Sequence, residues 1–206
     1  MSVVATPRVK LCGLRRPQDV EAANEAWPDY VGFVVDFPRS RRNVPASELA
    51  ALSRLVRPEI RRVGVFVNEP VEAIAELFDS GAIDVAQLHG NEEEDYLSRL
   101  RATCGVPVIQ AFRMRGAKDV ERAMASTAEL VLLDNGQGTG HTFDWSLARD
   151  VRRPYMLAGG LGPENVAQAI RSVHPWGVDM SGGVETAGAK DPIKMRAAVA
   201  AAKGAI

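Results

Sequence analysis

One thiol and one carboxyl group stand at the ends of two apolar segments that lie far apart in the chain. Cys12 closes the segment RVKLC, and Asp134 closes ELVLLD. Burial raises the pKa of a carboxyl group, which suits a general acid near neutral pH, and a thiol in a polar setting can act as a base. The two residues could therefore form an acid–base pair. The alternatives are a small buried packing residue for Cys12 and a loop anchor for Asp134.

Two pairs of glycines follow two later apolar segments. Gly159 and Gly160 come after PYMLA, and Gly182 and Gly183 come after WGVDM and Ser181. Glycines leave backbone N–H groups free to approach phosphate oxygens, and the start of a helix adds a favourable partial charge. Either pair alone would fit a tight turn equally well. The two pairs together predict a phosphate-binding site.

Further polar side chains stand at the ends of the same apolar segments. They are Lys10, Asn68, Gln87, His89, Arg113 and Asp179. Lys10 faces the same side of its predicted strand as Cys12, because side chains alternate. Arg42 lies in the run PRSRRN and could pair with a planar carboxylate, although a solvated surface is the usual setting of such a run. His89 fits a packing or hydrogen-bonding role as well as a catalytic one.

The segment NGQGTGHTFDW, residues 135–145, is long and rich in glycine, with Asp144 as a candidate helix N-cap. Such a loop could fold over a ligand, or it could be a flexible connection. We predict no metal site, because the three histidines are not at ligand spacing from one another.

Eight short apolar segments alternate with eight helical patterns, and these elements must position the reactive residues. The predicted strands are 8–12, 30–35, 62–67, 84–88, 106–112, 129–134, 154–158 and 176–180. The predicted helices are 17–26, 47–56, 69–81, 92–102, 117–126, 143–150, 163–173 and 191–203, the seventh with Pro163 at its first position.

Strict alternation of strands and helices predicts a parallel sheet, and eight units predict a closed (β/α)8 TIM barrel. We expect residues 1–206 to form a single catalytic domain of this fold. A doubly wound open sheet is the alternative, but KLCGLRRPQDV lacks the GxGxxG fingerprint expected after its first strand. Because barrel active sites form at the carboxyl ends of the strands, the reactive residues should meet at one mouth.

Composition limits the classes of partner. The chain has 206 residues, of which 46% are hydrophobic and 25% charged, as is usual for a globular domain. A net charge of −1 gives no sign of a basic surface for nucleic acid or anionic membrane. No apolar run reaches the roughly 18 residues of a membrane span. Two cysteines, and no evident leader in MSVVATPRVK, predict a cytoplasmic location.

Seven segments of the chain resemble, in order, the signatures of the phosphoribosylanthranilate isomerase family of tryptophan biosynthesis. VKLCGLRRPQDV resembles the family's VKICG-type opening, and VGFVVDFPRSRRNV resembles its second strand and loop. The others are VGVFVNEP, AQLHGNE, LLDNGQGTGHTFDW, LAGGLGPENV, and GVDMSGGVE followed by GAKD. The resemblance extends over the whole chain.

The resemblance implies an Amadori rearrangement of N-(5-phosphoribosyl)anthranilate to 1-(2-carboxyphenylamino)-1-deoxyribulose 5-phosphate. The family's catalytic cysteine falls on Cys12 as general base, and its catalytic aspartate falls on Asp134 as general acid. The arginine that binds the anthranilate carboxylate falls on Arg42. The family usually has two serines after the Asp-Val of the last strand, whereas this chain has DMSGGVE, with Met180 and Gly182. Because backbone amides carry most of such a phosphate site, we expect the site to be retained.

The resemblance also implies a small phosphosugar as the partner, with no cofactor, no nucleic acid and no membrane, and a monomer or homodimer as the assembly. The nearest rival is the aminoaldose isomerase of histidine biosynthesis, which uses aspartates at the ends of its first and fifth strands. Here those strands end in Cys12 and in Phe112 followed by Arg113. A barrel that only binds a phosphosugar is the rival from another class, and it would be expected to lose the acid or the base.

Overall fold

The apolar segments form the eight strands of a closed parallel barrel in the computed structural model, which describes residues 6–134 and 145–205. The strands are β1 (Arg8–Cys12), β2 (Tyr30–Val35), β4 (Arg61–Phe66), β5 (Val85–Leu88), β6 (Val108–Arg113), β7 (Leu130–Asp134), β8 (Tyr155–Leu157) and β9 (Gly177–Met180). β1 pairs with β2 on one side and with β9 on the other, so the sheet closes on itself. The predicted TIM barrel is confirmed, and the open sheet is excluded.

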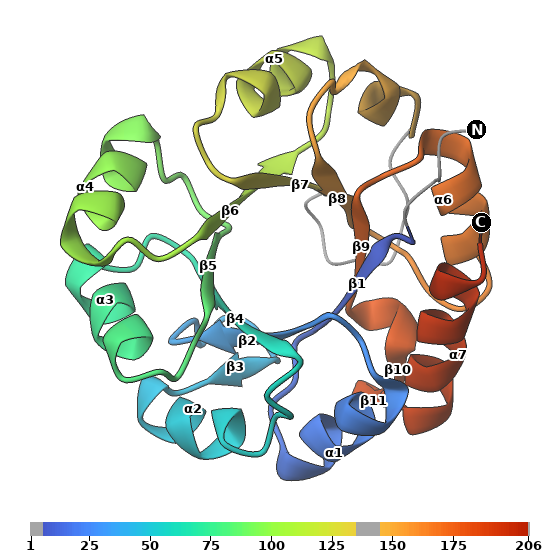
Figure 1. The fold of residues 1–206 in the computed structure, drawn as a ribbon, viewed down its shortest axis with the longest axis horizontal. Coiled ribbons are helices and arrows are strands. Elements are labelled where there is room, and N and C mark those ends of the chain that lie inside the picture. The colour runs from blue at the N-terminus through green and yellow to red at the C-terminus, as the bar shows by residue number, and fades with distance from the viewer. Residues whose placement is uncertain (1–5, 135–144, 206) are drawn as a thin grey trace.

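The helices form an outer ring around the strands (Figure 1). They are α1 (Pro17–Ala26), α2 (Ala46–Ser53), α3 (Val71–Asp79), α4 (Glu94–Cys104), α5 (Ala117–Ala125), α6 (Val166–Val173) and α7 (Pro192–Lys203). The helix predicted at 143–150 is the short 3₁₀ helix η1 (Trp145–Asp150) in the described part of the chain. Residues 135–144 of the loop predicted at 135–145, with the candidate N-cap Asp144, lie outside the described residues, and its last residue, Trp145, begins η1.

α6 begins at Val166, three residues later than the predicted start at Pro163. Asn165 explains the difference, because its side chain accepts a hydrogen bond from the backbone N–H of Gly162 and donates one to the carbonyl of Gly160. These bonds, of 2.9 Å each, close a turn before the helix. Pro163 therefore lies in that turn, and the prediction of a helix starting there is wrong.

Side chains divide between two cores according to the alternation along each strand. One set packs between the strands and the helices, and includes Val9 and Leu11 of β1. The other set fills the inside of the barrel, and includes Cys12, Val63 and Met156. The inner core places even-numbered residues of β1 inside the barrel, which is how a reactive side chain reaches its centre.

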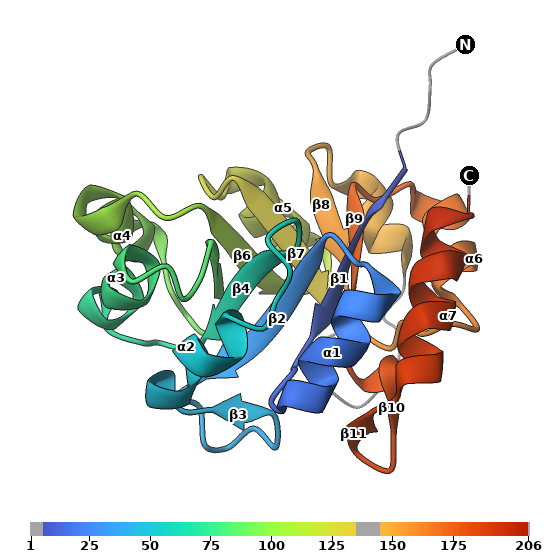
Figure 2. The same cartoon turned by 60° about the horizontal axis from the view of Figure 1, so that its bottom comes forward.

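Short elements that the sequence patterns did not predict lie at the carboxyl ends of the strands. β3 (Asn43–Val44) extends the sheet beside β2, and η2 (Gly182–Val184) follows β9. β10 (Glu185–Thr186) and β11 (Ala189–Lys190) form a small antiparallel hairpin. Figure 2 shows β3 and the hairpin at the same end of the barrel. Among the described helices, none is long and apolar enough to cross a membrane.

Candidate active site

A cavity of about 760 Å³ opens at the carboxyl ends of the strands. Thirteen of the residues that the sequence singled out line it, namely Cys12, Arg42, Asn68, Gln87, His89, Arg113, Asp134, Gly159, Gly160, Asp179, Ser181, Gly182 and Gly183. Among the described residues that the sequence singled out, Lys10 does not line the cavity, since it is fully buried inside the barrel. Residues from both ends of the chain thus meet at one mouth.

Cys12 lies against an ion pair inside the barrel. Nζ of Lys10 is 3.0 Å from Oδ1 of Asp179, and both side chains are at least nine-tenths buried. Gly32, opposite Cys12 on β2, makes room for these groups, because a Cβ there would lie 2.8 Å from Sγ of Cys12 and 3.1 Å from Nζ of Lys10. The absence of a side chain at Gly32 lets the thiol and the ammonium group occupy the same space.

The charged groups around Cys12 shift the pKa of its thiol in opposite directions. Burial raises the pKa of the Cys12 thiol above its ordinary value, and Asp179 raises it further, while Lys10 and Lys190 lower it. Burial works against the charge on Lys10, but attraction to Asp179, and to Cys12 when it is a thiolate, raises the pKa of Lys10 overall. In the free protein, Lys10 is therefore charged and the thiol is protonated at neutral pH.

Asp134 is at the end of β7 and faces His89, which follows β5. Oδ2 of Asp134 lies 3.4 Å from Nε2 of His89, and the other ring nitrogen, Nδ1, is 3.1 Å from the amide nitrogen of Gln87. If the amide donates to Nδ1, a neutral imidazole carries its proton on Nε2, toward the carboxyl group. His89 and Gln87 therefore orient the carboxyl group of Asp134 across the mouth.

The two glycine-rich loops lie against each other beside the cavity. Gly159 and Gly160 have φ values of 90° and 64°, in the left-handed region that side chains disfavour. A Cβ on Gly183 would lie 2.1 Å from the carbonyl oxygen of Leu161, and one on Gly162 would lie 3.0 Å from the carbonyl oxygen of Gly183. The backbone of each loop therefore packs directly against glycines of the other loop, where a side chain would not fit.

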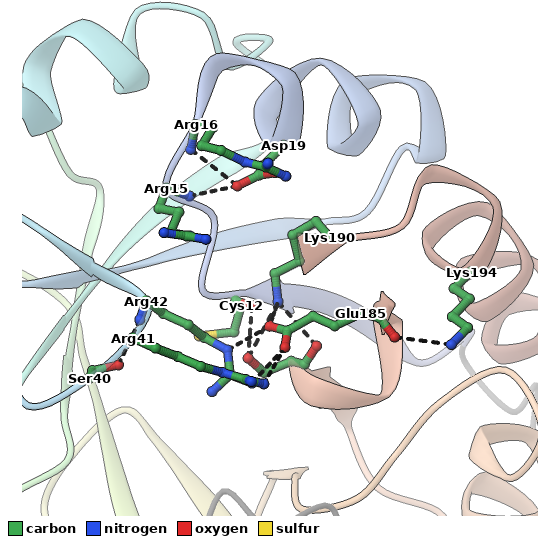
Figure 3. A network of polar contacts seen from close by, with 11 residues as sticks. Cys12, Arg15, Arg16, Asp19, Ser40, Arg41, Arg42, Glu185, Lys190 and Lys194 are labelled. Atoms are coloured by element: carbon green, nitrogen blue, oxygen red, sulfur yellow. Dashed lines mark hydrogen bonds and ion pairs between the residues drawn. The ribbon is translucent and has the colours of Figure 1, made fainter. Parts of the chain in front are cut away.

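Arg42 lies at the mouth and is bound to Glu185, a residue for which the sequence motifs predicted no role. Nε of Arg42 donates to Oε1 at 2.6 Å, and Nη2 donates to Oε2 at 3.0 Å. Lys190, also missed, donates to Oε1 of Glu185 at 3.0 Å and to the carbonyl of Ser181 at 3.1 Å. Figure 3 shows this network beside Cys12.

Glu185 and Lys190 were missed because a charged residue in a short hairpin has the sequence pattern of exposed surface. The sequence pointed to them only through the motifs GVE and GAKD, which contain Glu185 and Lys190 and contributed to the family resemblance without an assigned role. Within the described ranges, no group of three His, Cys, Asp or Glu side chains gathers as a metal site would require.

Known proteins match the chain over almost its whole length. The family model of N-(5'-phosphoribosyl)anthranilate isomerase matches residues 9–201. The enzyme of that name from Thermoanaerobacter sp. strain X514 is 40% identical over 204 residues, which cover 96% of this chain and 98% of that one. The solved phosphoribosyl anthranilate isomerase of Thermotoga maritima is 37% identical, with a TM-score of 0.86 over 96% of this chain and 99% of that one.

A solved phosphoribosyl anthranilate isomerase also matches in complex with a ligand, reduced 1-(o-carboxyphenylamino)-1-deoxyribulose 5-phosphate. It is 37% identical to this chain, with a TM-score of 0.84. The match covers 96% of this chain and 99% of that one.

Proposed function

The chain belongs to the N-(5'-phosphoribosyl)anthranilate isomerase family, enzymes of tryptophan biosynthesis, and we propose that Cys12 and Asp134 carry the proton transfers of its reaction. One observation carries the proposal. A thiol from β1 and a carboxyl group from β7 line one cavity, with Arg42 and two glycine-rich loops at the same mouth. This arrangement supplies an acid, a base and two anion-binding regions.

The substrate has two anionic groups, and the mouth offers a setting for each. The loops at Gly159–Gly160 and Ser181–Gly183 suit the phosphate, since their backbone can approach its oxygens closely. The guanidinium of Arg42 suits the carboxylate of the anthranilate. Phe37 also lines the cavity, from the loop that carries Arg42, and gives the aromatic ring an apolar surface.

Asp134 acts first, as the general acid. It donates a proton to the ring oxygen of the ribose, the bond between C1 and that oxygen breaks, and the nitrogen lone pair forms a C1=N iminium. Cys12, as the thiolate, then removes the proton from C2, and the electrons of that C–H bond move to the iminium. The resulting enolamine tautomerises to the ketone. The substrate's own iminium accepts the electrons, so these steps need no organic cofactor.

The test follows the loss of fluorescence of the anthranilate substrate with the purified protein. Cys12→Ser and Asp134→Asn keep the shapes of the side chains but remove the base or the transferable proton. Each should lower kcat by roughly 10²–10⁴-fold, the usual contribution of a general acid or base. Both variants should still bind reduced 1-(o-carboxyphenylamino)-1-deoxyribulose 5-phosphate.

The matched control is Cys104→Ser, because Cys104 is the other free cysteine and lies on α4, away from the cavity lining. Its kcat should stay within about threefold of the starting value. Near-normal turnover by Cys12→Ser would make Cys12 a packing residue. No turnover by the unmodified protein would overturn the proposed function itself.

A further inference from the structure

Glu185 is a carboxylate enclosed by three cations. Its side chain is only 5% exposed, and it accepts hydrogen bonds from Arg41, Arg42 and Lys190. Burial alone would raise the pKa of Glu185, but the bonds from Arg42 and Lys190 hold that pKa below its ordinary value. The carboxylate is therefore charged throughout the neutral range. Three positive charges around one negative charge leave this side of the mouth attractive to anions.

The bonds to Glu185 use one edge of the Arg42 guanidinium. Nε and Nη2 pair with the two carboxylate oxygens, at 2.6 Å and 3.0 Å. A guanidinium has five N–H groups in one plane, so Nη1 and the second N–H of Nη2 form another edge that can bind a second carboxylate. Because Glu185 occupies the first edge, it determines the direction in which the second edge points.

The backbone beside Arg42 leaves this arrangement little freedom. A Cβ on Gly13 would lie 2.3 Å from Cδ of Arg42, so the arginine stem packs directly over that glycine. Nη2 passes close to Gly182, where a Cβ would be 3.5 Å away. The stem is thus confined by Gly13 and the head is held by Glu185. Figure 3 shows Arg41, Arg42 and Lys190 converging on Glu185.

We infer that Glu185 is a positioning residue that holds Arg42 in place to bind the substrate's carboxylate. The inference rests on the proposed function, which assigns that carboxylate to Arg42. A mobile arginine would lose side-chain entropy each time it bound the substrate, whereas an arginine already held by Glu185 has lost it beforehand. Glu185 therefore increases affinity and selects substrates that carry a carboxylate, without touching the substrate.

The test compares two ligands, reduced 1-(o-carboxyphenylamino)-1-deoxyribulose 5-phosphate and the same compound without its carboxylate. The ratio of their dissociation constants within one variant is unaffected by a fraction of unfolded protein. The unmodified protein should prefer the carboxylate ligand by about 100-fold, as a charge-assisted bidentate pair implies. Glu185→Gln turns an amide N–H toward a cation, and should reduce that preference to less than about tenfold.

A double-mutant cycle separates positioning from a general loss of structure. Arg42→Ala should abolish the preference, and adding Glu185→Gln to Arg42→Ala should change the ratio by less than about twofold, because Glu185 acts through Arg42. Arg41→Gln is the matched control. Arg41 binds the same carboxylate but is 60% exposed and does not line the cavity, so it should keep the preference within about threefold.

Kinetics give the same contrast. Glu185→Gln should raise KM by about tenfold while kcat changes by less than about threefold, because a carboxylate contact acts in the ground and transition states alike. A preserved ligand ratio in Glu185→Gln would overturn the inference, as would an equal loss in Arg41→Gln. With either of these two results, turnover by the unmodified protein would still support the proposed function. If the unmodified protein showed no turnover, the proposed function, on which this inference rests, would itself be overturned.

Discussion

Cys12 is the residue whose protonation state in the free enzyme should limit kcat/KM near neutral pH. Because burial and Asp179 raise its pKa more than Lys10 and Lys190 lower it, the thiolate is the minor form at neutral pH. The value of kcat/KM reports ionisations of the free enzyme, so it should rise with pH through that pKa. The rising limb should lie above the value of about 8.5 for an ordinary thiol.

Two substitutions beside Cys12 should move that limb in opposite directions. Lys10→Met removes a positive charge that lowers the thiol pKa, so the limb should shift to higher pH. Asp179→Asn removes a negative charge that raises the pKa, so the limb should shift to lower pH. The measurement is kcat/KM against pH for the three proteins. Shifts in the same direction, or no shift, would mean that another group titrates.

Single residues could be predicted from the sequence where their position along a strand determined their setting. Cys12 and Asp134 end apolar segments, so the barrel rule alone brings them to one mouth. Glu185 could not be predicted, because its burial depends on Arg42, which lies 143 residues away in the chain. The burial of Lys190 has the same origin, since it depends on pairing within the mouth rather than on any local pattern.

At the scale of elements, the loops after β8 and β9 work as one unit because their backbones touch. Gly183→Ala would put a methyl group 2.1 Å from the carbonyl oxygen of Leu161, so the loops must move apart. Displacements of about 1 Å can cost 100-fold in function, and we expect inorganic phosphate to bind at least about tenfold more weakly. Isothermal titration calorimetry with inorganic phosphate measures the dissociation constant for this comparison.

Gly182→Ser provides the contrast, because a Cβ on Gly182 meets no atom closer than 3.5 Å. It adds the hydroxyl that the family resemblance leads us to expect at this position, and should keep or tighten phosphate binding. Equal weakening in both variants would show that any side chain in this segment is harmful, and that contact between the loops is not the cause.

The strands were predictable as elements, while the short pieces around the mouth were not. Every predicted strand is present, with ends within two residues, because buried parallel strands are continuous apolar runs. β3, β10 and β11 have two residues each, which is too short for any periodic pattern. η1 replaces the sixth predicted helix for a related reason, since its six residues make only about two turns, a length at which 3₁₀ helices are common.

At the scale of the whole molecule, α7 secures the closure of the barrel, packing against both α1 and β1. Met195 of α7 is fully buried, so Met195→Ala should lower the free energy of unfolding by about 2–5 kcal/mol. Ile193, two residues earlier, is 72% exposed, and Ile193→Ala should change it by less than about 0.5 kcal/mol. Urea denaturation followed by circular dichroism compares them. Equal effects would mean that α7 is not packed as described.

The pairing of β1 with β9 also has a consequence for the cell that makes this protein. β1 leaves the ribosome before β9, which covers its second edge and ends at Met180. For the roughly 10–40 s of synthesis, the nascent chain carries an unpaired edge, the kind of surface on which chains aggregate or chaperones bind. Cys12 likewise lacks Asp179 and Lys190 until both of those residues have been synthesised. Truncated chains made from an incomplete mRNA would therefore be inactive and prone to aggregate.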